Sequence, residues 1–246
     1  MNYQPIQKSL FILVLAIFSL QCQGQKDLLK PTSQDIDAIF KDYNNSASPG
    51  AAIAVVHQGE IVFKQGYGSA NLEYDVPITS KTIFHAASVS KQFTVFATLL
   101  LEEDGKLSLD DDVRKYLPEV PNFGKKITLR HLASHTSGIR DQWELLSMAG
   151  WRLDDVITGE HILRMVSKQK ELNFEPGAAY MYSNTGFTLL AEVVARVSGK
   201  SFSEFTQDRI FKPLGMVSFT ITMKGSLKTE LILIDKHETE ATSKAS

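Results

Sequence analysis

The chain has 246 residues, with 26 Lys and Arg against 28 Asp and Glu, and its formal net charge is −2 at pH 7. This balance argues against a protein that binds nucleic acid by charge. A single cysteine excludes a disulfide framework. The length is sufficient for one sizeable hydrophobic core, and nothing repeats along the chain.

The N-terminal residues are typical of a signal peptide. Lys8 precedes an apolar run from Leu10 to Leu20, which is too short to span a bilayer but suits the hydrophobic region of a signal peptide. Cleavage after Gly24 would meet the preference for a small residue. We therefore expect residues 1–24 to be removed and the protein to be exported, to the periplasm or the extracellular space, with no transmembrane helix in the mature chain.

Cys22 leaves a second form of export open. A lipoprotein signal requires a small residue before the lipidated cysteine, whereas the residue before Cys22 is Gln21. A membrane-anchored lipoprotein is therefore the less favoured alternative to a free exported protein.

Hydrophobic periodicity predicts a helix and then a hairpin. Apolar residues from Ile36 to Tyr43 recur at helical spacing after a cap at Thr32 or Ser33. Two strands are expected next, joined by a turn at Gln58-Gly59: Ala51–His57 and Glu60–Gln65.

The chain from Ser88 to about Leu214 reads as mainly helical. Gly199 is a stop signal for one helix, and Ser201 with Glu204 forms a capping box for the next. The expected helices are Ser88–Glu103, Leu129–Ser134, His161–Lys168, Phe187–Val197 and Phe202–Phe211.

Ser88-Val89-Ser90-Lys91 is the first candidate catalytic motif. If these residues open a helix, Ser88 and Lys91 share one face, with Cβ atoms roughly 5–6 Å apart. A lysine amine can then take the proton of a serine hydroxyl, provided that its surroundings favour the neutral amine. The spacing alone is equally compatible with an N-cap serine and a solvated lysine.

Tyr182-Ser183-Asn184 is the second candidate motif. The sequence places it in a loop ahead of a helix, where residues two apart can point the same way. Without further context, Tyr182 could be a half-buried aromatic anchor and Asn184 a turn residue or N-cap.

Together these motifs resemble the penicillin-recognising serine hydrolases, in particular the branch of class C β-lactamases and D-alanyl-D-alanine carboxypeptidases. The similarity covers about Gly50 to Thr220. Further stretches resemble that branch, in the family's order: Gly66–Asn71, Leu109–Val113, Leu132–Gly138 and Pro213–Met216. The resemblance implies an α+β, β-lactamase/transpeptidase-like fold, in which an antiparallel sheet is flanked by helices and a helical subdomain is inserted.

The resemblance also implies residue roles. Ser88 would be the acylated nucleophile, Lys91 its activating amine, Tyr182 a proton relay to the leaving group and from water, and Asn184 a hydrogen-bond partner of the substrate amide. The backbone N–H of Ser88 would be one half of an oxyanion hole. The expected activity is hydrolysis of an amide or ester bond in a small molecule or peptide, such as a β-lactam, a D-amino-acid peptide or an ester, without metal or organic cofactor.

The chain departs from the family near its end, because the third motif, a Lys-Thr-Gly or His-x-Gly sequence on a strand beside the nucleophile, is not found. Met223–Ser226 follows Tyr182 too closely and reads as a turn. We therefore expect residues 25–222 to be an incomplete β-lactamase-related domain with its C-terminal strands largely missing. Residues 223–246 would be an atypical polar tail, disordered at Lys236–Ser246, although Thr229–Ile234 could pair as a substitute strand.

The missing motif makes activity the open question. Its strand would supply a second oxyanion donor, whose loss typically lowers the rate by about 10²–10³, and a cation that helps keep Lys91 neutral. The alternative to an active hydrolase is therefore a truncated, non-catalytic remnant or a ligand-binding fragment. The sequence leaves the substrate and the oligomeric state open.

Two other motifs are weaker indications of function, one for a zinc site and one for a dinucleotide-binding loop. His131 and His135 have the i, i+4 spacing of a zinc helix, but Leu132 stands where a metalloprotease has glutamate, and no third ligand follows. His135 is expected to end a helix near the active-site cleft as a packing residue. Gly66-Tyr67-Gly68 lacks the third glycine of a dinucleotide loop and is expected to form a bulge or turn.

Overall fold

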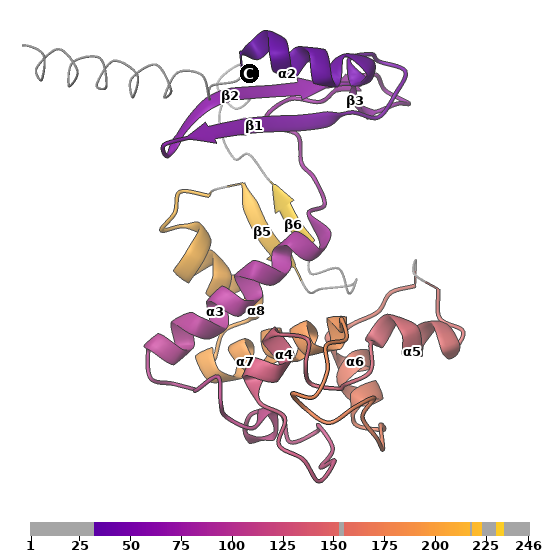
Figure 1. Ribbon diagram of the computed structural model, residues 1–246, viewed down its shortest axis with the longest axis vertical. Coiled ribbons are helices and arrows are strands. Elements are labelled where there is room, and N and C mark those ends of the chain that lie inside the picture. The colour runs from indigo at the N-terminus through magenta and orange to yellow at the C-terminus, as the bar shows by residue number, and fades with distance from the viewer. Residues whose placement is uncertain (1–31, 153–154, 217, 223–229, 234–246) are drawn as a thin grey trace, which may run out of the picture. The chain divides into compact units, whose positions relative to one another are not determined.

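The computed structural model describes residues 32–152, 155–216, 218–222 and 230–233 (Figure 1). The predicted signal peptide with Cys22, the segment Met223–Ser226 and the tail Lys236–Ser246 lie outside these residues. The chain divides into two compact units, and the boundary along the sequence lies between Thr82 and Ile83. Within the described residues, no helix is both long and apolar enough to cross a membrane.

The first unit opens with helix α2, Ser33–Phe40, and a 3-10 turn η1, Lys41–Tyr43. Thr32 is the N-cap of α2, one of the two positions that the sequence offers for it, and it forms a capping box with Asp35. The Phe40 ring stacks on Tyr67 with centroids 5.1 Å apart, and the Tyr67 hydroxyl donates to Asp37 at 2.7 Å. These contacts attach the helix to strand β2, alongside which it lies in Figure 1.

The strands of this unit form two ladders. β1, Ala51–His57, pairs antiparallel with β2, Glu60–Tyr67, so the predicted hairpin is confirmed. β3, Ser69–Asn71, pairs with β4, Val76–Pro77. Gly68 has φ +72° between β2 and β3, which confirms the turn expected at the glycine pair.

Helix α7, Asn184–Ser198, is the central helix of the second unit. Most of its residues are buried, and it contacts α3, α4, α5, α6 and α8. The approach to α4 is close, since a Cβ on Gly186 would lie 3.1 Å from the Leu132 carbonyl oxygen. The helical elements of this unit are η2 (Ala87–Ser90), α3 (Lys91–Glu103), η3 (Val113–Lys115), α4 (Leu129–Ala133), α5 (Gln142–Met148), α6 (Gly159–Val166), α7 (Asn184–Ser198), α8 (Phe202–Thr206) and η4 (Gln207–Phe211).

A short hairpin completes the described part of the second unit. β5, Phe219–Thr222, pairs antiparallel with β6, Glu230–Leu233. The strand expected at Thr229–Ile234 therefore forms over Glu230–Leu233, with β5 as its partner. The backbone of β6 lies beside η2, the turn that precedes α3 (Figure 1).

The predicted helices exist, with differences in type or at their ends. The helix expected from Ser88 begins as a 3-10 turn and becomes α-helical at Lys91. The helix expected from Phe187 begins at Asn184, so Asn184 is not a loop residue, and that expected at His161–Lys168 lies two residues earlier. The helix Phe202–Phe211 has the expected bounds but closes with the π-helical turn η4. Helix α5 was not predicted.

Candidate active site

Ser88 lies in the tight turn η2, at the start of the α3 segment. The residue before it, Ala87, has φ +45°, a left-handed conformation that is costly for a residue with a Cβ. Ser90 stabilises the turn by donating from its hydroxyl to the Ala87 carbonyl at 2.6 Å. Ser88 is exposed, and its backbone N–H donates no hydrogen bond to any of the residues that the structure describes. Backbone strain of this kind is concentrated at functional sites.

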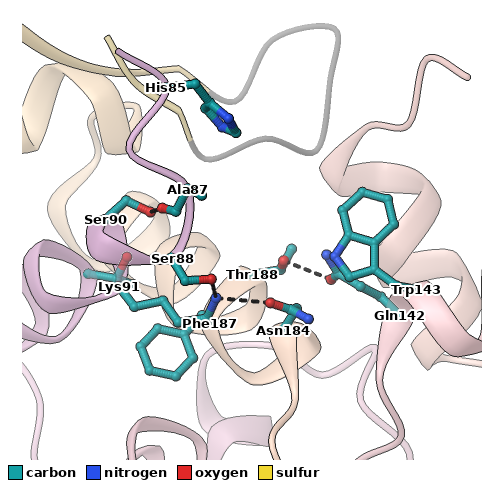
Figure 2. A pocket seen from close by; sticks show the side chains of 11 residues that line it. His85, Ala87, Ser88, Ser90, Lys91, Gln142, Trp143, Asn184, Phe187 and Thr188 are labelled. Atoms are coloured by element: carbon teal, nitrogen blue, oxygen red, sulfur yellow. Dashed lines mark hydrogen bonds between the residues drawn. The ribbon is translucent and has the colours of Figure 1, made fainter. Parts of the chain in front are cut away.

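Lys91 connects the two sequence motifs. Its Nζ donates to Ser88 Oγ at 2.9 Å and to Asn184 Oδ1 at 2.9 Å, as Figure 2 shows. The same nitrogen lies 4.9 Å from the ring centroid of Tyr182 and 5.6 Å from that of Phe187. Lys91 therefore joins the Ser88 motif to the motif of Tyr182 and Asn184 through its amine nitrogen.

Tyr182 completes the contacts of the serine. Its hydroxyl lies 2.9 Å from Ser88 Oγ, in a geometry that lets either oxygen donate. Burial acts to raise the pKa of Tyr182, but the interactions with Lys91 and Ser88 outweigh it and hold this pKa below its ordinary value. A phenol with a lowered pKa beside a serine hydroxyl can accept the serine proton.

Asn184 is held in place by Asp141, a residue that the sequence did not single out. Asp141 is 8% exposed, and its Oδ2 accepts from both the backbone N–H and the Nδ2 of Asn184, at 2.5 and 2.8 Å. Its Oδ1 accepts from the Trp143 N–H, so the same carboxylate caps α5. Because the Asn184 amide nitrogen faces Asp141, its oxygen faces Lys91.

The sequence contains one signal that could have drawn attention to Asp141, namely its position as the N-cap of a helix. Aspartate immediately ahead of Gln142–Met148 is a helix-start signal. The pattern would have located α5, whereas the contact with Asn184 joins residues 43 positions apart and depends on the tertiary fold.

His135 packs on the ring of Tyr182, which agrees with its expected place at a helix end near the cleft. It follows α4 with φ +59°, and its ring stacks on the Tyr182 ring with centroids 4.4 Å apart. Its Nδ1 accepts from the Ser183 N–H at 3.1 Å, which fixes an unprotonated Nδ1. Burial, reinforced by the charge of Lys91, lowers the pKa of His135.

His131 has a structural role of its own. Its Nδ1 accepts from the Thr128 N–H and closes the capping box of α4. The described residues contain no group of three or more His, Cys, Asp or Glu side chains that could hold a metal ion.

A small cavity of about 150 Å³ adjoins these residues. In Figure 2, η2 and α3 contribute Ser88 and Lys91, α7 contributes Asn184 and Phe187, and α5 contributes Trp143. The structure thus brings the four predicted site residues, Ser88, Lys91, Tyr182 and Asn184, into one hydrogen-bonded cluster.

Residues 36–226 match the family model described as Beta-lactamase. This chain belongs to the beta-lactamase family. The match confirms the resemblance inferred from the motifs, and the solved structures that it resembles confirm the α+β, β-lactamase/transpeptidase-like fold.

Relatives within the family include peptidases and penicillin-binding proteins. A D-aminopeptidase of Gluconobacter oxydans is 36% identical over 68% of this chain and 31% of its own length. Penicillin-binding protein 4* of Bacillus subtilis is 32% identical over 74% of this chain and 40% of its own length. The crystal structure of D-amino acid amidase from Ochrobactrum anthropi SV3, complexed with L-phenylalanine, has a TM-score of 0.65 and 27% identity, covering 78% of this chain and 52% of that one. The chain thus spans about a third of the D-aminopeptidase and about half of the amidase.

Proposed function

We propose that this protein is a serine hydrolase that forms an acyl-enzyme at Ser88 and transfers the acyl group to water. The observation that carries the proposal is the convergence of Lys91 Nζ and the Tyr182 hydroxyl on Ser88 Oγ, each at 2.9 Å. A serine hydroxyl that contacts both a lysine amine and a phenol of lowered pKa can lose its proton more readily than a free serine.

The contacts suggest a division of roles. The Tyr182 phenolate takes the proton of Ser88 as Oγ attacks the substrate carbonyl, and returns it to the leaving amine or alcohol. In the second half, Tyr182 takes a proton from water as the water oxygen attacks the acyl carbon, and it returns this proton to Ser88 Oγ as that oxygen leaves. Lys91 donates hydrogen bonds to Ser88 Oγ and to Asn184, and Asn184 hydrogen-bonds the substrate amide. The backbone N–H of Ser88 donates to the developing oxyanion.

The printed names of the relatives favour one substrate class. D-aminopeptidases and a D-amino acid amidase are among them. We therefore propose amides and short peptides of D-amino acids as the first substrates to test, with β-lactams and simple esters as the other candidates.

The decisive experiment is covalent labelling followed by intact-mass measurement. Purified protein is treated with a fluorophosphonate and, separately, with a penicillin, and Ser88→Ala is treated in parallel. Ser147→Ala, which removes an exposed hydroxyl from α5, is the matched control. A single adduct on the wild type and on Ser147→Ala, absent from Ser88→Ala, is expected. An adduct that survives in Ser88→Ala would refute the assignment.

One observation favours a second function, ligand binding without turnover. The strand beside η2 has the sequence Glu230-Leu231-Ile232-Leu233, which contains neither the cation nor the glycine of the family's third motif. Folded protein that binds a D-amino-acid amide but gives neither an adduct nor a hydrolysis product would support this function and exclude the hydrolase.

We also propose export, on the basis of Lys8, the apolar run Leu10–Leu20 and Gly24. Expression in a Gram-negative host, followed by cell fractionation and mass measurement, tests this proposal. A mature chain that begins at Gln25 is expected in the periplasm. A lipid-modified chain that begins at Cys22 would support the lipoprotein alternative, and an uncleaved cytoplasmic chain would exclude both.

A further inference from the structure

A second and larger cavity lies between α5 and α6, away from Ser88. Its volume is about 620 Å³, against about 150 Å³ for the cavity at Ser88, and the two share no lining residue. Pockets of 300–1,000 Å³ are typical of small-molecule sites. Part of the wall is apolar and is formed by Leu145, Leu146, Ala149, Trp151 and Met165.

The remaining wall is cationic. Arg140, Arg164, Lys168 and Lys170 line the cavity, and no acidic residue does so in the part of the chain that the structure describes. Over the same residues, no carboxylate forms an ion pair with any of these four, although Arg140 donates from Nε to Asn173. A concentration of positive charge in a chain with a net charge of −2 favours an anion at this place.

Gln169 borders the cavity, but its amide does not face the space that a ligand could fill. The residue is only 9% exposed, its amide atoms are shielded, and among the residues that the structure describes they have no hydrogen-bond partner. The chemistry of a ligand therefore follows from the apolar and the cationic parts of the wall.

We propose that the cavity between α5 and α6 binds a small organic anion that carries a carboxylate and an apolar group, as an N-acylated aromatic amino acid does. The carboxylate contacts Arg164 and Lys168, and the apolar group packs on Trp151 and Met165. The proposal is independent of the chemistry at Ser88, because the two sites have separate walls.

Two probes separate these contributions. N-acetylphenylalanine has the carboxylate and the apolar group, whereas N-acetylphenylalanine amide lacks the charge. Each is titrated calorimetrically into Ser88→Ala protein, which prevents turnover. We expect N-acetylphenylalanine to bind at least about tenfold more tightly than its amide, the effect of one charge-assisted hydrogen bond.

Variants then locate the binding. Arg164→Gln combined with Lys168→Gln is expected to weaken binding of N-acetylphenylalanine about tenfold or more, and to abolish its preference over the uncharged amide. Lys212→Gln, on the π-helical segment, is the matched charge control and leaves the affinity unchanged.

The chain's two tryptophans provide a second readout, because Trp151 lines this cavity and Trp143 lines the one at Ser88. Binding that changes the fluorescence of a Trp143→Phe protein but not of a Trp151→Phe protein supports the assignment. The proposal is wrong if folded protein binds neither probe at about 10 mM, or if the double variant at Arg164 and Lys168 binds N-acetylphenylalanine as the parent does.

Discussion

Asp141 accepts two hydrogen bonds from Asn184 through a single oxygen, one from the backbone N–H and one from the side-chain amide. This fixes which end of the Asn184 amide faces Lys91. A carboxylate that touches neither Ser88 nor, in the proposed mechanism, the substrate thus sets the position of the lysine.

Replacement of Asp141 by Asn should slow acylation of Ser88 by about 10–100-fold, because Asn184 loses its orientation and Lys91 its anchor. The rate constant for fluorophosphonate labelling measures the effect. Asp141 also caps α5, so the variant is compared with Thr158→Ala, which removes the N-cap of α6. Thr158→Ala should lose about 0.5–2 kcal/mol of stability, whereas Asn is itself a favourable N-cap and should preserve the cap of α5. Equal acylation rates in the two would show that Asp141 is only a cap.

Replacement of Lys91 by Ala should slow acylation by about 10²–10⁴-fold, the usual contribution of a group that assists proton transfer. The fold should persist, because Lys91 contacts the site and not the core. Circular dichroism verifies the fold, and Lys200→Ala, which breaks only an exposed ion pair with Asp208, is the control. A Lys91→Ala protein with the parental rate would eliminate the lysine from the mechanism.

The lowered pKa of Tyr182 predicts the pH dependence of acylation. If the phenolate is the proton acceptor, the rate rises with pH as Tyr182 deprotonates, and the midpoint of this rise lies below the ordinary tyrosine pKa of about 10. Labelling rates between pH 6 and 10.5 measure the midpoint. Tyr182→Phe should lose this rise together with most of the rate. An unchanged midpoint in Tyr182→Phe would assign the titration to another group.

Stability should fall as the solution is acidified, because burial lowers the pKa of both His131 and His135. In the unfolded chain these histidines bind protons at about pH 6.5, whereas in the folded protein they resist protonation to a lower pH. Their contribution is thus fully present above about pH 6.5 and is lost as the pH falls through the folded pKa values.

Thermal denaturation between pH 8 and pH 5 tests this sign. His135→Asn keeps a residue type that tolerates positive φ and should flatten the pH dependence of Tm. A Tm that rises on acidification in this range would contradict the prediction.

Substitution of Gly66 by Ala should unfold the first unit, because a Cβ there would lie 2.0 Å from the Ile78 carbonyl oxygen. Gly59→Ala, in the β1–β2 turn, meets no atom within 4 Å and should lose only about 1 kcal/mol from its φ of +83°. Limited proteolysis of the segment before Ile83 compares the two. Equal protection in both variants would show that this close packing is not required.

Much of this architecture follows from local pattern. The cap at Thr32 or Ser33, the capping box at Ser201, the turn at Gln58-Gly59 and the stop at Gly199 are local signals, and the structure has all four at the expected positions. The proximity of Ser88 and Lys91 was likewise predictable, since residues three apart face the same way in 3-10 as in α geometry.

The sequence could not predict the features that depend on distant contacts. Whether the turn at Ser88 is 3-10 or α-helical depends on the strained Ala87 and the Ser90 hydrogen bond. Asn184 was expected in a loop, but its N–H finds an acceptor in Asp141, and this allows α7 to begin three residues early. The buried and unpartnered Gln169 has no sequence signature at all.

The hydrogen bond between Ser88 and Tyr182 joins residues 94 positions apart, and that between Lys91 and Asn184 spans 93. Neither can form until the intervening chain has closed a loop of that length, so these contacts add nothing to the early, local stages of folding. We therefore expect the cluster to assemble only when α3 docks on α7. An intermediate with its helices formed would still have an unactivated Ser88, and recovery of labelling during refolding would lag behind recovery of helical circular dichroism.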